Sequence, residues 1–174
     1  TRLDECGIDF AHMLTTAGLG GVEVRDDELR GVVCRALNTM FRDLFRDVSD
    51  RLRPVAVIPT QTPQEAIREL DHAVLELGFK AAMIGTEIRT PGESWRSIAF
   101  EPPYDYDPFW QRCVELRIAP ICHAANMGAQ SRSSPTNYVY NHLGMFAGGA
   151  EFFCRSLFMG GVTNRFPQLN FGLL

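Results

Sequence analysis

The sequence predicts an α/β fold, and more specifically an incomplete (β/α)8 TIM barrel. Apolar runs of strand length alternate with amphipathic stretches of helix length, and no hairpin signal separates them. This alternation is typical of parallel strands joined by right-handed crossovers. Parallel strands need cover on both faces, so the sheet is either an open doubly wound sheet or a barrel.

The last apolar run has no helix after it. A terminal strand of that kind would expose an edge that is prone to pairing with other chains. We therefore expect residues 1–174 to be a single domain that spans roughly strands 2 to 6 of a barrel. The first strand and the last two or three would then lie outside this sequence.

The composition is that of an ordinary globular protein, with 45% hydrophobic and 22% charged residues. The net charge of -4 gives no electrostatic reason to expect binding to nucleic acid or to an anionic membrane. No apolar run is long enough for a membrane span, and no signal peptide is visible. We expect a cytoplasmic location.

The cysteines are odd in number, and no two of them have C-x-x-C spacing. They lie in apolar stretches, which predicts reduced, buried thiols in a cytoplasmic protein. The five are Cys6, Cys34, Cys113, Cys122 and Cys154.

The first half of the chain predicts a strand over residues 7–16 and then a long helix. Asp26 or Asp27 would cap this helix, which is expected to run to about Leu52 because apolar residues recur at helical spacing. A second strand follows over residues 55–59.

The next helix has the clearest boundaries. Thr62 is the expected N-cap, Pro63 fits the first helical position, Glu65 completes a capping box and Gly78 ends the helix. A third strand is expected over residues 80–86, a polar loop over 87–106, and a helix over 109–117 that starts at Asp107-Pro108.

The second half ends with a strand, a loop, a long helix and a strand. The strand covers residues 119–124, the loop 126–135, the helix about 136–159 and the last strand 169–174. Gly160-Gly161 stops the long helix. The carboxyl ends of parallel strands are where α/β enzymes place their chemistry, so His123 lies at a candidate active site.

His123 is the histidine that these elements place at a strand end. Side chains alternate along a strand, so His123 shares a face with Ile121 while Cys122 points the other way. If Cys122 packs under the helices, His123 points into the barrel near its rim, where it suits a metal ligand or a proton shuttle. A packed histidine bonded to neighbouring backbone is the alternative.

The other histidines are weaker candidates. His12 lies in the middle of a strand and is expected in the core, whereas His72 is expected on an exposed helix surface. His142, on the long helix, could reach the rim as an acid or a substrate contact, although packing or surface exposure is the favoured explanation.

The loop after the fourth strand is rich in polar side chains. It holds Asn126 and Arg132, with Asn137 and Asn141 close behind. Loops at this end of a barrel meet the polar groups of substrates. Arg132 could bind a substrate carboxylate through two parallel hydrogen bonds, or it could be a solvated loop arginine.

A nucleotide site is disfavoured. Residues 18–21 (GLGG) follow the first strand, but they lack the G-x-G-x-x-G order, and residues 22–24 do not open a helix. The P-loop and G-x-S-x-G motifs are absent from the sequence.

Five segments together resemble the amidohydrolase-2 family. These are the metal-dependent TIM-barrel hydrolases and decarboxylases related to aminocarboxymuconate-semialdehyde decarboxylase. The similar segments are residues 6–10 (CGIDF), 60–66 (TQTPQEA), 106–110 (YDPFW), 121–123 (ICH) and 161–171 (GVTNRFPQLNF). Each is short, but their order and spacing extend over essentially the whole chain.

The resemblance implies a divalent metal, usually zinc, with manganese as the alternative. The family holds it with a histidine pair or Glu-x-His on strand 1, a histidine that ends strand 5 and an aspartate on strand 8. His123 matches the strand-5 ligand. By the family spacing the strand-1 pair would precede Thr1 and the aspartate would follow Leu174, so this segment alone is expected to be inactive.

The implied function is a metal-dependent enzyme, either a hydrolase or a non-oxidative decarboxylase. Its substrates would be small cyclic or aromatic carboxylates, amides or lactones, with Arg132, Asn126 and His142 as candidate contacts. The alternative is a metal-free barrel that acts as a binding or structural module. The apolar long helix suggests a homodimer.

Overall fold

The computed structural model describes residues 2–89, 95–123 and 134–174, and its strands are mainly parallel. One parallel pair is β1 (Ala11–Met13) with β2 (Leu52–Pro54). A parallel sheet follows in the order β3 (Ala56–Ile58), β4 (Ala82–Ile84), β7 (Pro120–Cys122) and β8 (Gly172–Leu173). Only Val55 separates β2 from β3, so the two sheets are continuous. The predicted alternation of parallel strands and helices is confirmed.

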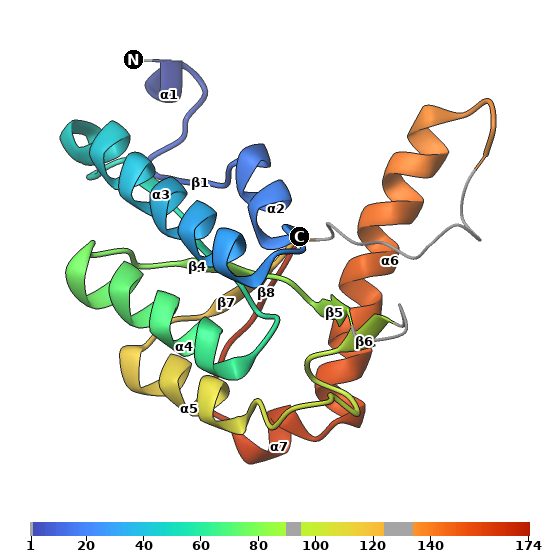
Figure 1. Ribbon diagram of the computed structural model, residues 1–174. Helices are drawn as coiled ribbons and strands as arrows, with labels where there is room; N and C mark the ends of the chain where they lie inside the picture. The colour runs from blue at the N-terminus through green and yellow to red at the C-terminus, as the bar shows by residue number, and fades with distance from the viewer. Residues whose placement is uncertain (1, 90–94, 124–133) are drawn as a thin grey trace.

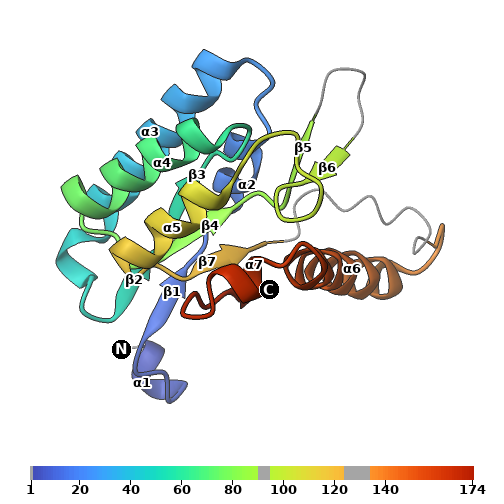
Figure 2. The same ribbon diagram turned by 90° about the horizontal axis from the view of Figure 1, so that it is seen from below.

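Three helices form a layer on one side of the sheet. They are α3 (Asp27–Phe45), α4 (Pro63–Asp71) and α5 (Asp107–Leu116), and Figures 1 and 2 show them side by side. The remaining helices are α1 (Arg2–Glu5), α2 (Thr16–Val22), α6 (Tyr138–Met159) and α7 (Val162–Arg165). Figure 2 shows α6 and α7 across the strands from the α3–α4–α5 layer.

The two faces of the sheet are set by its register. Val57, Met83 and Ile121 are aligned across β3, β4 and β7, so their side chains share one face. Gly18 of α2 lies against this face, since a Cβ at position 18 would be 2.6 Å from the Val57 side chain. Cys122, on the opposite face, is fully buried.

A side chain of α3 completes the hydrogen bonding of β3. The Val55 amide still donates to Met13 of β1 (3.1 Å), but β1 ends there. Two residues later the Val57 amide donates to Asn38 Oδ1 (2.7 Å), and the Val57 carbonyl accepts from Asn38 Nδ2 (3.0 Å). Asn38 Nδ2 also donates to Glu69 of α4 (2.8 Å). The fully buried carboxamide therefore joins α3, α4 and the sheet.

A buried ion pair fixes α3 against the start of α4. Arg30 donates to both carboxylate oxygens of Glu65, at 2.9 and 3.0 Å, and also to Asp27 and the Val24 carbonyl. Burial by itself lowers the pKa of Arg30, but the hydrogen bonds that Arg30 donates to Glu65 and Asp27 outweigh it, and the pKa is raised. Arg30 and Glu65 are both buried and are joined by two hydrogen bonds. The pair therefore specifies how the two helices meet.

The predicted loop over residues 87–106 contains a hairpin, which the sequence analysis missed. Strands β5 (Glu87–Arg89) and β6 (Trp95–Ser97) pair in antiparallel fashion. Gly160, at the carboxyl end of α6, lies so close to the Ala99 carbonyl that any side chain at position 160 would clash. The glycine predicted as a helix stop is therefore also a packing requirement.

Two predicted boundaries were wrong. The helix expected to reach Leu52 ends at Phe45, followed by a 3₁₀ turn over Arg46–Val48. Arg51 holds the chain in a turn, since its guanidinium donates to the carbonyls of Ile8 (2.6 Å) and Asp9 (3.1 Å). The strand expected over residues 7–16 is confined to Ala11–Met13.

The glycine-rich segment is a helix rather than a loop. Thr15 caps α2, and its Oγ1 accepts from the Gly18 amide at 3.2 Å. The expectation for His12 was also wrong, because β1 lies at the edge of the described sheet and leaves His12 exposed. His72 is only 13% exposed and pairs with Glu76, at 2.8 Å, so the predicted surface position was wrong too.

The helices of the described ranges include none that is long and apolar enough to cross a membrane. The most apolar of them, α6, does expose large hydrophobic side chains. They are Tyr138, Val139, Tyr140, Leu143, Phe158 and Met159. The homodimer stays a prediction.

Replacing Asn38 with alanine should strongly destabilise the chain. The change leaves the Val57 amide and carbonyl without partners inside the protein, at a cost of about 2–4 kcal/mol in the free energy of unfolding. Urea denaturation followed by circular dichroism measures the loss. Asn164→Ala, at an exposed position on α7, is the matched control and should cost less than about 0.5 kcal/mol. Equal effects of the two changes would contradict the role given to Asn38.

The thiols should divide into two classes of reactivity. Cys34, Cys113 and Cys122 are buried, and burial raises the pKa of each to about 12. The reactive thiolate is then roughly 10⁻⁴ of each thiol at about pH 8. Cys6 and Cys154 are exposed, which corrects the prediction that they are buried. Ellman's reagent should modify these two rapidly and the other three only after denaturation; rapid modification of Cys122 would show that β7 is open to solvent.

Candidate active site

The carboxyl edge of the parallel sheet carries His123. Ile84 of β4 is aligned with Cys122 of β7, so Gly85 and His123, the residues that follow them, lie at the same edge of the sheet. His123 is the first residue after β7, whereas the strand was predicted to continue to residue 124. Its position follows from the short apolar strand that ends at Cys122.

The His123 ring is half-buried and keeps a free nitrogen. It packs edge-on against Phe146 of α6, with ring centroids 5.4 Å apart. Its Nδ1 is buried, and none of the described residues offers it a hydrogen bond. Burial lowers the pKa of His123, so the ring is neutral at physiological pH. A neutral imidazole with an unpaired nitrogen is the form that binds a metal ion.

An aromatic stack connects His123 to His142. Phe146 lies 4.5 Å from the His142 ring, between centroids, and His142 stacks on Tyr138 at 5.3 Å. Tyr138 Oη and His142 Nδ1 are 3.3 Å apart. The three rings lie one helical turn apart along α6, so they form a wall that leads from the strand end to exposed His142. The structure thus brings together two of the predicted site residues.

The other predicted polar residues fall into two groups. Asn126 and Arg132 lie outside the described residues. Asn137 and Asn141 have structural roles: the Asn137 side chain caps α6 by accepting from the Tyr140 amide (2.9 Å), and the Asn141 side chain bonds the backbone of Ser134. Capping explains why asparagines occur there.

Glu87 is an ionisable residue at this edge that the sequence analysis missed. It starts β5, three residues after β4 ends, and is half-buried, and burial raises its pKa. An acidic residue directly after the predicted strand over residues 80–86 was the available signal. It was overlooked because residues 87–106 were treated as one polar loop.

Hydrogen bonds fix the chain around this edge. Tyr106, buried at the start of α5, donates to the Thr60 carbonyl at 2.6 Å. The Thr60 hydroxyl in turn donates to the Gly85 carbonyl at 3.2 Å. The segments that follow β3 and β4 are therefore tied together by side chains that are themselves buried.

A complete metal site is not present within the described ranges. No group of three or more His, Cys, Asp or Glu side chains is close enough there to hold an ion. A protein site for a catalytic metal uses at least three ligands. His123 can supply one of them.

Comparisons with known proteins agree on one family and one fold. A sequence model of the amidohydrolase family (Amidohydro_2) matches residues 6–173. A decarboxylase of Emericella nidulans, OrsB, is 28% identical over 78% of the chain and 42% of its own length. Gamma-resorcylate decarboxylase of Polaromonas sp. is 29% identical over 71% of the chain and 37% of its own length.

Solved structures show the same architecture. A 2,6-dihydroxybenzoate decarboxylase bound to 2,6-dihydroxybenzoate matches with a TM-score of 0.76 and 21% identity, over 97% of this chain and 52% of that one. A dihydroxybenzoic acid decarboxylase from Polaromonas sp. JS666, with manganese and 2-nitroresorcinol, matches with a TM-score of 0.74 and 22% identity, over 98% and 51%.

The chain spans about two fifths of the curated relatives and about half of the solved structures that it matches. Its fold is therefore a partial TIM barrel, as predicted. Since the family match extends over nearly all of its residues, the chain belongs to the amidohydrolase family, Amidohydro_2.

Proposed function

We propose that this chain is part of a divalent-metal-dependent decarboxylase that acts, without oxidation, on a small hydroxylated aromatic carboxylate. The observation that carries the proposal is the position of His123, a neutral imidazole with an unpaired buried nitrogen at the carboxyl edge of an amidohydrolase-family sheet. The names of the relatives favour decarboxylation over hydrolysis of an amide or lactone.

His123 would be one metal ligand. A divalent cation at this position would orient and polarise the oxygens of the substrate. The remaining ligands would come from outside the described residues, as the family resemblance implies for strands 1 and 8. Manganese in related structures makes it a candidate beside zinc.

The aromatic wall on α6 suits a flat substrate. Phe146 packs against His123 and would restrict which side of the ring a ligand approaches. His142, exposed and stacked on Tyr138, would offer a polar contact at the outer end of the wall. Arg132 and Asn126 are proposed as contacts for the substrate carboxylate and hydroxyl groups.

The proposed reaction replaces the carboxyl group of the ring with a proton and releases carbon dioxide. Electrons of the broken bond stay with the ring carbon, which then takes the proton. Half-buried Glu87, whose raised pKa favours the protonated form, lies at the same edge and is a candidate proton donor.

His123→Ala in the full-length protein should remove both metal and activity. Mass spectrometry of the purified protein should find near-stoichiometric manganese or zinc, reduced at least about tenfold in the variant. Release of carbon dioxide from 2,6-dihydroxybenzoate should fall in parallel. His72→Ala, on the outer helix layer, is the matched control and should leave both unchanged.

Three results would contradict the proposal. A folded full-length protein without metal would favour a non-catalytic binding module. Turnover of amides or lactones but of no hydroxybenzoate would assign the hydrolase branch. Full metal content in His123→Ala would remove this residue from the ligand set.

A further inference from the structure

A cavity lies at the opposite end of the sheet from His123. It has a volume of about 470 Å³ and is lined by the carboxyl end of α3, the turn that leads into β2, the last two residues of β2, and residues 77–80, which precede β4. Lys80 precedes Ile84, which is aligned with Cys122, by four residues, and this corresponds to about 13 Å of extended chain. The cavity and the candidate active site are therefore separate.

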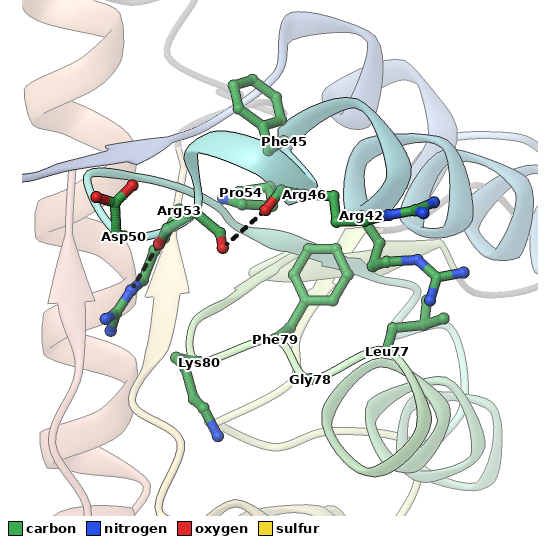
Figure 3. Close-up of a pocket in the computed structure, with 11 residues that line it drawn as sticks. Arg42, Phe45, Arg46, Asp50, Arg53, Pro54, Leu77, Gly78, Phe79 and Lys80 are labelled. Atoms are coloured by element: carbon green, nitrogen blue, oxygen red, sulfur yellow. Dashed lines mark hydrogen bonds between the residues drawn. The ribbon is translucent and has the colours of Figure 1, made fainter.

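Apolar side chains form the floor of the cavity. Figure 3 shows the Phe79 ring in the middle, with Leu77 and Arg42 on one side and Arg53 and Lys80 on the other. Phe79 is buried, while Phe45, Pro54 and Leu77 are half-buried. A volume of this size with an apolar floor is in the range of pockets for small organic ligands.

Positive charge dominates the rim. Arg42, Arg46, Arg53 and Lys80 line the cavity, together with Asp50 as the acidic lining residue. Arg42 and Arg46 share a single carboxylate oxygen of Asp43, at 2.8 and 2.9 Å. Four cationic side chains thus face two carboxylates in a chain whose net charge is -4.

Two of these cations are not paired with a carboxylate in the described part of the chain. The Arg53 guanidinium donates to the Ser49 carbonyl (3.2 Å) and lies 4.9 Å from the centroid of the Phe10 ring. Lys80 is exposed, and its amine has no hydrogen-bond or ion-pair partner in that part of the chain. Both side chains can therefore still donate hydrogen bonds to an incoming anion.

Two backbone hydrogen bonds close the turn before Phe79. The Phe79 amide donates to the Ala73 carbonyl at 3.0 Å, and the Leu77 amide donates to the His72 carbonyl at 3.1 Å. These two carbonyls are therefore occupied, and the four cationic side chains of the rim oppose the partial negative charge of the helix carboxyl ends.

We propose that this cavity is a second binding site, for a small aromatic anion. The flat ring of the ligand would lie against Phe79, and its carboxylate or phosphate would be held at the rim by Arg53 and Lys80. The site is independent of the proposed decarboxylase activity, because none of its residues lies at the carboxyl edge of the sheet.

Lys80 provides the experiment in the full-length protein. Reductive methylation with ¹³C-formaldehyde labels lysine side chains and preserves their charge, and the methyl signal that is missing in Lys80→Arg is assigned to Lys80. Phenyl phosphate or benzoate should shift the Lys80 methyl signal saturably, with a Kd below about 1 mM. The other methyl signals should stay in place, and the tighter probe identifies the preferred anion.

Matched variants and ligands separate this site from nonspecific binding. Arg53→Glu should weaken binding at least about tenfold, whereas Arg25→Glu, an exposed arginine away from the cavity, should not. Neutral benzyl alcohol should bind at least about tenfold more weakly than the anions. His123→Ala should bind as the parent chain does.

The proposal is overturned by any of three results. The Lys80 signal would show no saturable shift up to about 10 mM ligand. Alternatively, benzyl alcohol would bind as well as the anions, or His123→Ala would abolish binding and so place the ligand at the other end of the sheet. Circular dichroism of each variant confirms that it is folded.

Discussion

The parallel register of β3, β4 and β7 is the constraint on which the arrangement of this molecule depends. Because the strands run in one direction, every segment that follows a strand emerges at one edge, and every segment that precedes a strand enters at the other. His123 and Glu87 both lie at the first edge for this reason. The ends of the covering helices and the basic cavity are gathered at the second.

Polar contacts specify this arrangement, and the apolar core alone would not. Leu70, Ala66 and their neighbours could pack against the sheet in several shifted registers, since burial is not directional. Arg30 with Glu65, and Asn38 with Glu69, tolerate one relative position of α3 and α4. A shift by one helical turn would leave buried charges without partners, which is costly.

Local signals made part of the fold predictable. Thr62, Pro63 and Glu65 lie within one turn of each other, and the helix that they predicted begins at Pro63 with Thr62 as its cap. The end of the long helix was not predictable in this way, because the turn at Arg51 depends on carbonyls more than forty residues away. The β5–β6 pair was missed because its strands are three residues long, too short to show alternation.

The candidate site, like the fold, was predictable only where local sequence determines it. The place of His123 followed from a local apolar run, whereas its contact with Phe146 depends on where α6 lies. Asn137 and Asn141 looked like substrate contacts because the sequence does not distinguish an asparagine that caps a helix from one that faces a ligand.

The carboxamide of Asn38 has the same donor and acceptor as a peptide group, and it occupies the place beside Val57 that a neighbouring strand would take. The chain is therefore free to depart from the sheet after Met13 and to form α2, whose Gly18 lies against the Val57 side chain. One amide side chain thus lets the strands separate on this side without creating a template for intermolecular β-pairing. The segment after Met13 can therefore change its path, while the backbone groups of Val57 keep their hydrogen bonds to Asn38.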